Sequence, residues 1–545
     1  MNSQLVKFNG YEDNSIMIIS QKYYLIISLF FCIFFQFTQQ ARAIPAFPGA
    51  EGFGADAVGG RGGIVIKVSN LNDNGAGSLR AAVEQTFPRI IIFEVSGIIY
   101  LESTLKITSP YITIAGQTSP EGIMVSGKTV LVNTHDVLIQ HMRFGAGTRS
   151  VAYNRDENGD IIFYDRPQYY FPPQGTGPDN CAGNPTSEEL GFPCAISGGS
   201  DPETLDTFVV AGKYWAKNEA YNIMIDHCSF RWGVDETLTL TGGVTNTTIQ
   251  WSIVSEGLDK AGHPKGKHSK GLMVSGKFVY PNTISLHHNY IAHHGDRSPL
   301  LMSPEGVDTV VDFVNNVVYN WDKRLVPYGQ EYAKINWVNN YAKIGPSSYA
   351  DSCEVGHWPK DYPPAQILYV QGNIGATRLS QSAPQWNVQD YFYNRALPVD
   401  WQKTSPWPAP SITSSEMSVS LADCILSAVG ATAPKRDSVD TRVIRDFSAG
   451  SGKIINNVVF PQDYPLFETK ASPPIDSDND GMPDSWEAAN GLNPTHDDSA
   501  LDKNGDGYTN IEEYLHYLST QSYSYNSSCM PLKIKGINIM TPYGN

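Results

Sequence analysis

A short signature, in which asparagine lies beside an apolar or aromatic residue, recurs in the second half of the chain. It occurs at His288-Asn289-Tyr290, Asn315-Asn316-Val317, Asn339-Asn340-Tyr341 and Asn456-Asn457-Val458. The asparagines at 289, 316 and 340 lie 27 and 24 residues apart, a period that suits one coil of a parallel β-helix. Asparagine side chains stacked at the coil turns would bond to one another and to backbone groups, which satisfies polar atoms inside a solenoid.

Short apolar runs separated by glycine, asparagine and serine turns predict a mostly β domain. The expected strands are Ile64 to Val68, Ile90 to Phe93, Tyr111 to Ala115, Val137 to Met142, Asn222 to Ile225 and Thr248 to Val254. Helical periodicity is scarce apart from a short candidate at Ser78 to Glu84. A β-sandwich or propeller with asparagine-rich turns is the alternative, but continuous valine and isoleucine runs favour strands buried in parallel stacks. We therefore expect an all-β chain built on a parallel β-helix.

The composition limits the classes of partner. With 545 residues and 41% hydrophobic content, the chain can bury a large core and has room for one long domain and a small module. A formal net charge of −16 argues against a nucleic-acid partner, because clustered cations dominate sequence-independent binding of DNA and RNA. A polyanionic sugar would need a locally cationic site or bridging metal ions.

The first 43 residues differ in composition from the rest and are typical of a secretory signal peptide. Lys22 precedes an apolar run from Tyr23 to Phe35, which is too short to span a bilayer, and small residues follow at Ala41-Arg42-Ala43. We expect cleavage after this site, with Met17 as an alternative start and an uncleaved anchor as the competing interpretation. The mature chain is then secreted and has no membrane association.

Six of the seven cysteines lie beyond this leader. In an oxidising compartment, Cys181 and Cys194 would form a disulfide that staples the Pro/Gly-rich loop around them, although the sequence alone does not give the connectivity. Cys228 lies within an apolar strand pattern, so we expect it to be a buried free thiol. The cysteine spacings indicate neither a zinc site nor a thiol nucleophile.

The most specific motifs lie between residues 226 and 299. They are Asp226-His227-Cys228, Trp232-Gly233-Val234-Asp235-Glu236, His268-Ser269-Lys270-Gly271, His287-His288-Asn289 and Asp296-Arg297-Ser298-Pro299. Three earlier segments accompany them, at residues 46–54, 77–82 and 114–118. In order and separation these residues resemble the bacterial pectate lyases of polysaccharide lyase family 1. The resemblance implies a right-handed, single-stranded parallel β-helix over residues 44–465 that cleaves uronate polymers by β-elimination.

This reaction needs a base that removes the C5 proton of a uronate, a cation that polarises the C6 carboxylate, and departure of the C4 oxygen. The resemblance implies that Arg297 is the base and that Lys270 holds the substrate carboxylate. The two residues lie 27 positions apart, about one coil. A guanidinium is a very weak acid, so the role of base calls for a desolvated, cation-rich site and an alkaline optimum.

Other cations near these motifs are further candidates. Lys265 and Lys267 belong to the same lysine-rich loop as Lys270 and compete with it for the carboxylate. Lys267, His268 and Arg143 are the expected substrate-binding residues.

Calcium is the cofactor that the resemblance implies, held by carboxylates of adjacent coils because oxygen ligands suit this ion. The strand pattern makes Asp206 and Asp235, which lie 29 residues apart, the best candidates, while Asp226 is expected to be bonded within its own turn. Two positions depart from the family pattern: Thr239 stands where a second aspartate is common, and Met302 where a second arginine is expected. The missing charges leave methyl-esterified pectin as an alternative substrate.

A linker at residues 466–475 leads to two matches to the calcium-loop pattern within residues 476–520. The expected ligands are Asp476, Asp478, Asp480, Asp484 and Glu487 in the first loop and Asp502, Asn504, Asp506 and Glu513 in the second. A solvated acidic tail would not place glycine and glutamate so regularly. With short helices expected at Ser485 to Asn490 and Thr509 to Leu518, the EF-hand-like pair resembles dockerin or thrombospondin type 3 repeats, followed by a tail at residues 521–545.

The sequence therefore predicts a secreted, monomeric, calcium-dependent pectate lyase that converts polygalacturonate, an acidic polysaccharide, into 4,5-unsaturated oligogalacturonides. The alternatives are a pectin lyase, a lyase for another uronate polymer, and a non-catalytic β-helix that binds polysaccharide. The C-terminal module leaves room for a cell-surface or scaffold partner.

Overall fold

The computed structural model describes residues 44–148, 205–213, 219–263, 266–276, 280–322, 328–350, 352–358, 367–380, 382–386, 388–390, 396–468 and 472–521. The predicted leader, Lys265, the predicted pair Cys181 and Cys194, and the tail beyond Gln521 lie outside these ranges. The chain divides into two compact units, Met1–Ile44 and Pro45–Asn545, and the fold below is that of the second unit.

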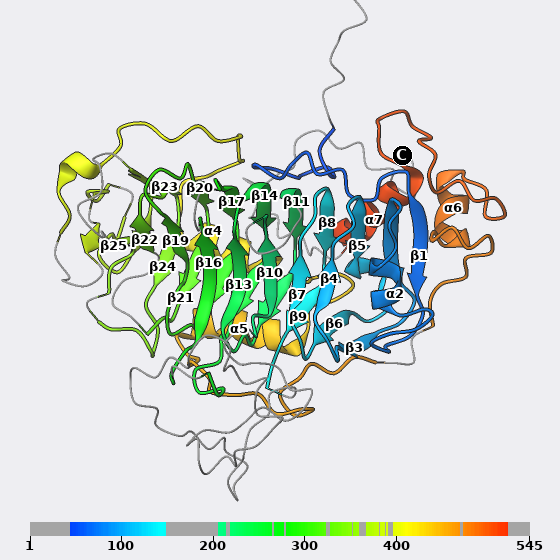
Figure 1. Ribbon diagram of the computed structural model, residues 1–545, viewed down its shortest axis with the longest axis horizontal. Coiled ribbons are helices and arrows are strands. Elements are labelled where there is room, and N and C mark those ends of the chain that lie inside the picture. Colours follow the sequence, from blue (N-terminus) through cyan, green and yellow to red (C-terminus); the bar gives the residue numbers. More distant parts are fainter. Residues whose placement is uncertain are drawn as a thin grey trace, which may run out of the picture. The chain divides into compact units, whose positions relative to one another are not determined.

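Three parallel sheets form this unit, and successive coils add one strand at a time to each sheet (Figure 1). Sheet A contains β1 (Ile64–Val68), β2 (Arg89–Phe93), β5 (Ile112–Ala115), β8 (Val137–Gln140), β11 (Ala220–Asp226), β14 (Val244–Gln250), β17 (Thr283–His287), β20 (Val310–Val314), β23 (Lys334–Val338) and β26 (Leu368–Gln371). Sheet B contains β3 (Gly97–Tyr100), β6 (Ile123–Ser126), β9 (Arg143–Gly145), β12 (Ser229–Arg231), β15 (Ile253–Ser255), β18 (Tyr290–Ala292), β21 (Val317–Tyr319), β24 (Tyr341–Lys343) and β27 (Ile374–Gly375). Sheet C contains β4 (Leu105–Ile107), β7 (Val130–Val132), β10 (Phe208–Ala211), β13 (Glu236–Thr241), β16 (Lys270–Ser275), β19 (Leu300–Ser303), β22 (Tyr328–Glu331), β25 (Gly356–Trp358) and β28 (Gln389–Asp390). This is the right-handed, single-stranded parallel β-helix that the sequence predicted.

The six strands expected from the sequence correspond to strands of sheet A, but two of them, Val137 to Met142 and Thr248 to Val254, extend across a turn. The run Thr248 to Val254 is divided into β14 and β15, because Trp251 turns the chain with a φ of 49°. His141, His227 and His288 make the same left-handed turn after β8, β11 and β17. A single left-handed residue redirects the backbone while the apolar pattern continues, so the periodicity of the sequence does not reveal the turn.

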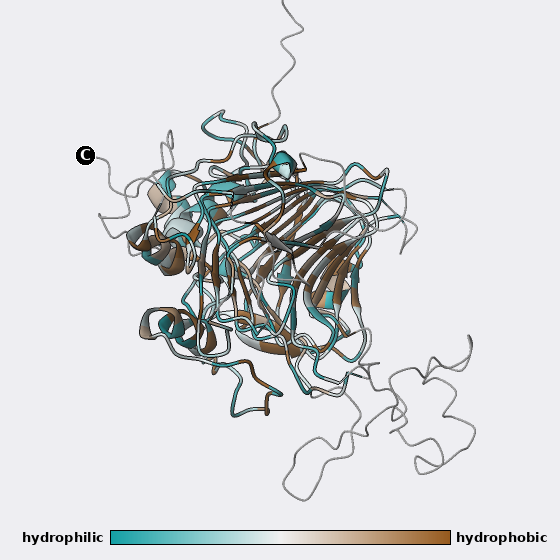
Figure 2. Cartoon of the chain, turned by 90° about the vertical axis from the view of Figure 1, so that its left-hand side faces the viewer, coloured by the Kyte–Doolittle hydropathy of each residue, from teal (hydrophilic) through white to brown (hydrophobic). Residues whose placement is uncertain are grey.

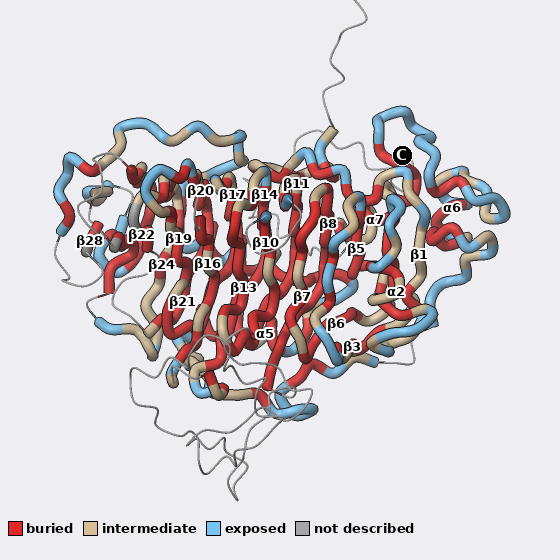
Figure 3. The backbone as a smooth tube through the Cα atoms, viewed as in Figure 1, coloured by how far each residue is buried: buried red, intermediate tan, exposed pale blue. Residues whose placement is uncertain are grey.

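Inward-facing side chains of all three sheets form one continuous apolar core. The strands are mostly hydrophobic in Figure 2 and mostly buried in Figure 3. Stacked parallel strands bury both faces where other segments cover the outside, which is why their sequences read as unbroken apolar runs. Among the helices in the described part of the chain, none combines the length and apolar character needed to cross a membrane.

The predicted asparagine ladder is present at the turn between sheets A and B. Three asparagine side chains each accept from the backbone of the asparagine one coil earlier. The backbone N–H of Asn289 donates to Asn316 Oδ1 (3.0 Å), the N–H of Asn316 donates to Asn340 Oδ1 (2.8 Å), and the N–H of Asn340 donates to Asn373 Oδ1 (3.0 Å). Each Nδ2 group of Asn289, Asn316 and Asn340 donates to a backbone carbonyl at the end of a sheet A strand. The ladder therefore satisfies buried polar groups coil by coil.

The fourth copy of the signature is not part of this ladder. Asn456-Asn457-Val458 lies in irregular chain, and the backbone carbonyl of Val458 accepts from Thr148 Oγ1. The interpretation of this copy as a coil turn was wrong, because the chain has left the solenoid before it reaches residue 456.

Helices after the last coil were also missed. Both α4 (Val419–Ala428) and α5 (Ser438–Ala449) pack apolar side chains, including Leu421 and Phe447, on the outer face of sheet B. Each begins at a capping residue: Ser418 Oγ accepts from Leu421 N at 3.1 Å and Asp437 Oδ1 accepts from Asp440 N at 2.8 Å. Further helical segments are α2 (Leu79–Val83), η1 (Gly116–Thr118) and η3 (Val399–Trp401), and α2 matches the predicted helix.

Two C-terminal helices follow the expected acidic loops: α6 (Asp484–Asn490) and α7 (Asn510–Gln521). They do not form a detached module. Met482, Trp486 and Ile511 form a cluster with Ile90 and Ile92 on the outer face of sheet A. The residues after the predicted linker are thus part of the same compact unit.

The asparagine ladder gives a direct test. Asn316→Ala leaves the backbone N–H of Asn289 and the carbonyl of Leu286 without these partners, so the free energy of unfolding should fall by about 2 to 3 kcal/mol. Denaturant unfolding followed by circular dichroism measures the change. Asn456→Ala, which alters the same signature outside the ladder, is the matched control and should stay within about 0.5 kcal/mol of the parent. Equal losses in both variants would contradict the ladder's role.

Candidate active site

Polar side chains from successive coils form a row where the strands of sheet C begin. Glu236 is the first residue of β13 and Lys270 is the first residue of β16, and the two are partners in the strand register. Lys270 in turn forms a parallel bridge with Asp296. Lys270 and Arg297 therefore lie on adjacent coils at the same edge, as their spacing predicted.

Arg297 lies in the turn before β19 and has a left-handed backbone, with a φ of 57°. Its carbonyl accepts from Leu272 N at 2.7 Å, and its N–H donates to Asp296 Oδ1 at 2.8 Å, so neighbouring groups fix the turn. The guanidinium forms an ion pair with Glu236 through Nη1. The side chain is 25% exposed, so solvent reaches it.

Lys270 is also paired with a carboxylate. Its Nζ lies 2.7 Å from Asp296 Oδ2, and the hydroxyl of Tyr328 donates to the other oxygen of Asp296 at 3.2 Å. Both predicted catalytic cations are therefore held by carboxylates of other coils: Asp296 lies one coil from Lys270, and Glu236 lies two coils from Arg297. The cation-rich surroundings expected for Arg297 are instead a row of alternating charges.

Three carboxylates gather beside these cations. Oxygens of Asp206, Asp235 and Glu236 lie within 4.8 Å of one another, and Asp206 Oδ1 accepts from the backbone N–H of Glu236 at 3.1 Å. Burial, followed by repulsion from Asp235, raises the pKa of Asp206 well above its usual value. Clustered oxygen donors with excess negative charge fit a hard divalent cation such as Ca²⁺.

The structure brings the two predicted calcium ligands together and adds Glu236, which the sequence analysis did not assign. Strand alternation places neighbouring residues on opposite faces. Asp235, however, lies in the turn before β13, so alternation does not separate it from Glu236. Two adjacent acidic residues at the predicted start of a strand were the sequence feature that could have identified Glu236 as a third ligand.

His268 contacts Asp235 rather than solvent. Its Nε2 lies 2.7 Å from Asp235 Oδ1, and its ring stacks on that of His263 with centroids 3.5 Å apart. Burial raises the pKa of Asp235, but hydrogen bonds from His263 and His268 outweigh this and lower it overall. Burial lowers the pKa of His268 to about 4, so the ring is neutral at pH 7 and donates to the carboxylate. His268 is thus placed to orient Asp235, which differs from the predicted contact with substrate.

The other two predicted substrate-binding residues lie in opposite environments. The side chain of Arg143 is 0% exposed and pairs with Asp437 at 3.1 Å, so the prediction for Arg143 was wrong because helix α5 and the segment before it cover this part of sheet B. Lys267 is 68% exposed, with its Nζ 3.9 Å from Asp259 Oδ2. Lys267 remains available to a ligand.

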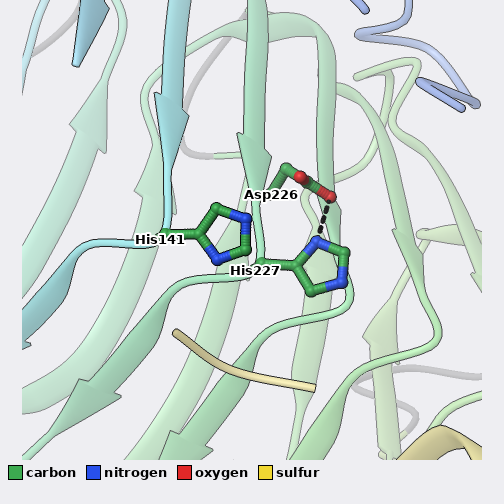
Figure 4. A group of neighbouring side chains, drawn as sticks. All are labelled: His141, Asp226 and His227. Atoms are coloured by element: carbon green, nitrogen blue, oxygen red, sulfur yellow. Dashed lines mark ion pairs between the residues drawn. The ribbon is translucent and has the colours of Figure 1, made fainter. Parts of the chain in front are cut away.

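A further cluster, drawn in Figure 4, consists of His141, Asp226 and His227. Nδ1 of His227 lies 2.9 Å from Asp226 Oδ1. Nε2 of His141 lies 3.1 Å from Ser519 Oγ, and its Nδ1 accepts from Ala433 N at 3.3 Å. Both ring nitrogens of His141 are therefore engaged, and this buried cluster joins the coils to the C-terminal segments, consistent with the structural role expected for Asp226.

The first C-terminal loop gathers Asp476, Asp478, Asp480 and Glu487 in two overlapping carboxylate clusters. Asp484 is not among them, since its two oxygens accept from the N–H and hydroxyl of Ser477 at 2.7 Å each. The assignment of Asp484 as a ligand is thus not supported by its position.

In the second loop the expected ligands bond to one another and to the loop backbone. Asp502 accepts from Gly507 N at 2.9 Å, and Asn504 Nδ2 donates to both Asp506 and Glu513 at 3.2 Å.

Cysteine chemistry takes no part in the candidate site. Cys228 is buried and free, which confirms the prediction, and burial raises the pKa of its thiol. Cys353 is buried, with its Sγ 3.5 Å from the carbonyl of Val355, whereas Cys424 on α4 is disulfide-bonded.

Several known proteins are similar to this chain over most of its length. No family model matches the chain. A protein from Aspergillus terreus named "Probable pectate lyase C" is 30% identical over 497 residues, covering 88% of this chain and 96% of that protein. Proteins of the same name from Emericella nidulans (30% over 505 residues; 90% and 97% covered) and Neosartorya fischeri (29% over 506 residues; 89% and 97% covered) are similar. These relatives are fungal, so the expected bacterial affiliation gains no support, and none of the names refers to dockerin or thrombospondin repeats.

Solved structures are more distant. The cedar pollen allergen jun a 1 is 18% identical, with a TM-score of 0.40 and coverage of 70% of this chain and 92% of that chain. A mutant pectate lyase from Bacillus subtilis is 15% identical, with a TM-score of 0.41 and coverage of 72% and 98%. At these TM-scores the fold assignment rests on the parallel sheets themselves.

The buried position of Arg143 gives a test. Arg143→Met leaves Asp437 with one fewer buried cation, so the free energy of unfolding should fall by about 3 to 5 kcal/mol. Lys267→Met, at an exposed predicted site, should stay within about 0.5 kcal/mol of the parent. Thermal or denaturant unfolding of both variants measures this. A stable Arg143→Met protein that binds polysaccharide more weakly would restore the original prediction.

Proposed function

The chain belongs to the pectate lyase family and is a polysaccharide lyase, and on this premise we propose that it is an exported, calcium-dependent enzyme that cleaves polygalacturonate by β-elimination. One observation carries the proposal: Lys270, Arg297 and the carboxylates Asp206, Asp235 and Glu236 converge at one edge of sheet C. Cations that bind a uronate thus lie beside a group of oxygen donors that suits calcium.

The calcium requirement follows from the donor set. Asp206, Asp235 and Glu236 would hold the ion, with His268 orienting Asp235. Bound there, Ca²⁺ would neutralise the substrate carboxylate and so make the adjacent C5 proton more acidic. Such bridging also explains how a protein with a net charge of −16 binds a polyanion.

Arg297 takes the C5 proton in this proposal. The electron pair of the C5–H bond forms the C4–C5 double bond, and the C4–O bond breaks. The departing oxygen keeps that bond's electrons and takes a proton from solvent, and the other product has a 4,5-unsaturated end. A guanidinium paired with a carboxylate is stabilised in its protonated form. Glu236 belongs both to this ion pair and to the group of three carboxylates. A calcium ion that neutralises the three carboxylates would therefore weaken the ion pair between Glu236 and Arg297.

Lys270 holds the uronate carboxylate. Asp296 keeps its Nζ at the same edge as Arg297, and because the ion pair is partly exposed, a substrate carboxylate can compete for the ammonium. The lysine and the base then act on one sugar ring from adjacent coils, which fixes orientation before the proton moves.

Partly methyl-esterified pectin is the second candidate substrate. Met302 pairs with Ser275, and Thr239 pairs with Met273, so the surface next to the charged row lacks the additional arginine and aspartate. An esterified carboxyl group is neutral, so its binding requires neither the additional arginine nor the additional aspartate. This observation favours some tolerance of methyl esters.

Export is supported by the composition of the first 43 residues and by the disulfide at Cys424, since disulfides persist in oxidising compartments.

The catalytic assignment is tested with purified mature enzyme. Arg297→Ala should lower kcat on polygalacturonate by about 10²- to 10⁴-fold, because the proton loses its acceptor. The rise of near-ultraviolet absorbance from the unsaturated product, at alkaline pH with calcium or with a chelator, measures the rate. Arg445→Ala, at an exposed arginine on α5, is the control and should retain full activity. An active Arg297→Ala enzyme would remove Arg297 from the role of base, and faster turnover of esterified pectin would make that polymer the preferred substrate.

The metal assignment gives a pair of opposite expectations. Glu236→Gln removes one charge from the carboxylate group and should raise the calcium concentration for half-maximal activity by about tenfold. Thr239→Asp adds a carboxylate beside Asp206 and should lower the calcium concentration for half-maximal activity. Activity against free calcium concentration measures both. Unchanged calcium dependence in the two variants would place the ion elsewhere.

A further inference from the structure

Five carboxylates gather at the start of the C-terminal helices. Oxygens of Asp476, Asp478 and Asp480 lie within 4.8 Å of one another, and so do oxygens of Asp480, Glu487 and Asp498. Asp480 belongs to both groups, so the five form one cluster. Asp498 comes from beyond the twelve-residue loop, and its backbone N–H donates to Asp480 Oδ2 at 3.3 Å.

Glu487 is the residue that points to a ligand. Its side chain is 0% exposed, and both carboxylate oxygens are buried without a hydrogen-bond partner among the residues that the structure describes. A buried carboxylate with no partner and with like-charged neighbours is costly, so the folded chain needs something else at this position.

The chemistry of the cluster favours one class of ligand. Every clustered side chain offers oxygen, and none offers sulfur or imidazole. Hard divalent cations that accept many carboxylate ligands prefer such a set, and calcium tolerates irregular geometry better than magnesium does. The glycine at position six of the loop, Gly481, has a φ of 98°, which permits the sharp turn that folds the aspartates inward.

The same loop presses against the first coil. Nζ of Lys67, on β1, lies 2.8 Å from Asp476 Oδ2 and 3.3 Å from Asn479 Oδ1. A Cβ atom on Gly481 would lie 2.8 Å from Val65 Cγ1, so the loop backbone contacts the strand directly. Figure 1 shows α6 beside β1, and Arg61 pairs with Glu512 of α7 at 2.9 Å.

We propose that Asp476, Asp478, Asp480, Glu487 and Asp498 bind one Ca²⁺ ion, and that this ion fastens α6 and α7 to the outer face of the first coils. The site differs from the carboxylates at sheet C in its residues and in its sheet. Its role is structural, and it does not depend on the proposed lyase reaction.

Glu487→Gln is the decisive variant in the full mature chain. It keeps the size of the side chain and removes the unpartnered charge. In a chelator, its thermal midpoint should equal or exceed that of the parent, because the repulsion is gone. Calorimetric titration with CaCl₂ should detect one bound ion fewer than in the parent, and added calcium should raise the midpoint less.

Two adjacent aspartates supply a matched pair. Asp498→Asn removes a charge from the cluster and should weaken binding at this site by about tenfold. Asp497 is exposed, and its Oδ1 accepts from the N–H and hydroxyl of Ser499. Asp497→Asn should bind calcium as the parent does. Equal calcium binding in the two variants would overturn the proposal.

Hydrogen exchange tests the fastening. Calcium should slow amide exchange in β1 and β2 of the parent and of Asp497→Asn, but not of Glu487→Gln. If calcium slowed amide exchange only near Asp206 and Asp235, the proposed structural role of the C-terminal ion would be overturned. A Glu487→Gln protein less stable than the parent in chelator would show that Glu487 stabilises the fold without an ion, and would overturn the site itself.

Discussion

The hydrogen bonds that stack one coil on the next are the constraint on which the rest of this structure depends. They hold each strand in register with its neighbour, and the asparagine ladder repeats that register at the turn between sheets A and B. Because the register is fixed, residues about one coil apart in sequence become neighbours in space. Glu236, Lys270 and Asp296 form their row for this reason.

Charge balance at the row determines what it can bind. Lys270 and Arg297 each have a carboxylate partner, while Asp206 and Asp235 have no lysine or arginine partner among the described ion pairs. The resting site is therefore an alternation of charges with a local excess of negative charge. A ligand that brings both a cation and a carboxylate replaces one set of ion pairs with another. The positive and the negative side chains of the site therefore keep a partner of opposite charge, which limits the free energy lost when they are desolvated.

The sequence predicted what depends on coil spacing and missed what depends on distant contacts. Lys270, Arg297, Asp206 and Asp235 were placed correctly relative to one another because local periodicity determines their positions. Arg143 has its partner almost three hundred residues away, at Asp437, and no local pattern shows that α5 will cover it.

The C-terminal loop shows the same limit within one motif. The loop pattern predicted that Asp476, Asp478, Asp480 and Glu487 converge. It did not predict that Ser477 engages Asp484, nor that Asp498 enters the cluster from beyond the loop. The sequence also did not show that the helices after these loops pack on β2, because an apolar face has the same pattern whether it packs on its own helices or on a sheet.

The contact between the two ends of this unit has a consequence for the order of folding. Arg61 and Glu512 are 451 positions apart, whereas paired residues of neighbouring coils, such as Asp312 and Asn336, are 24 positions apart. Closing so long a loop is entropically costlier than stacking a neighbouring coil, so the coils can assemble progressively while the end-to-end contact must wait. During that interval Ile90 and Ile92 lack their cover, and the first coils present an adhesive surface to other chains. Chains cut short before the last helices would keep that surface permanently, and we expect them to self-associate rather than remain dispersed.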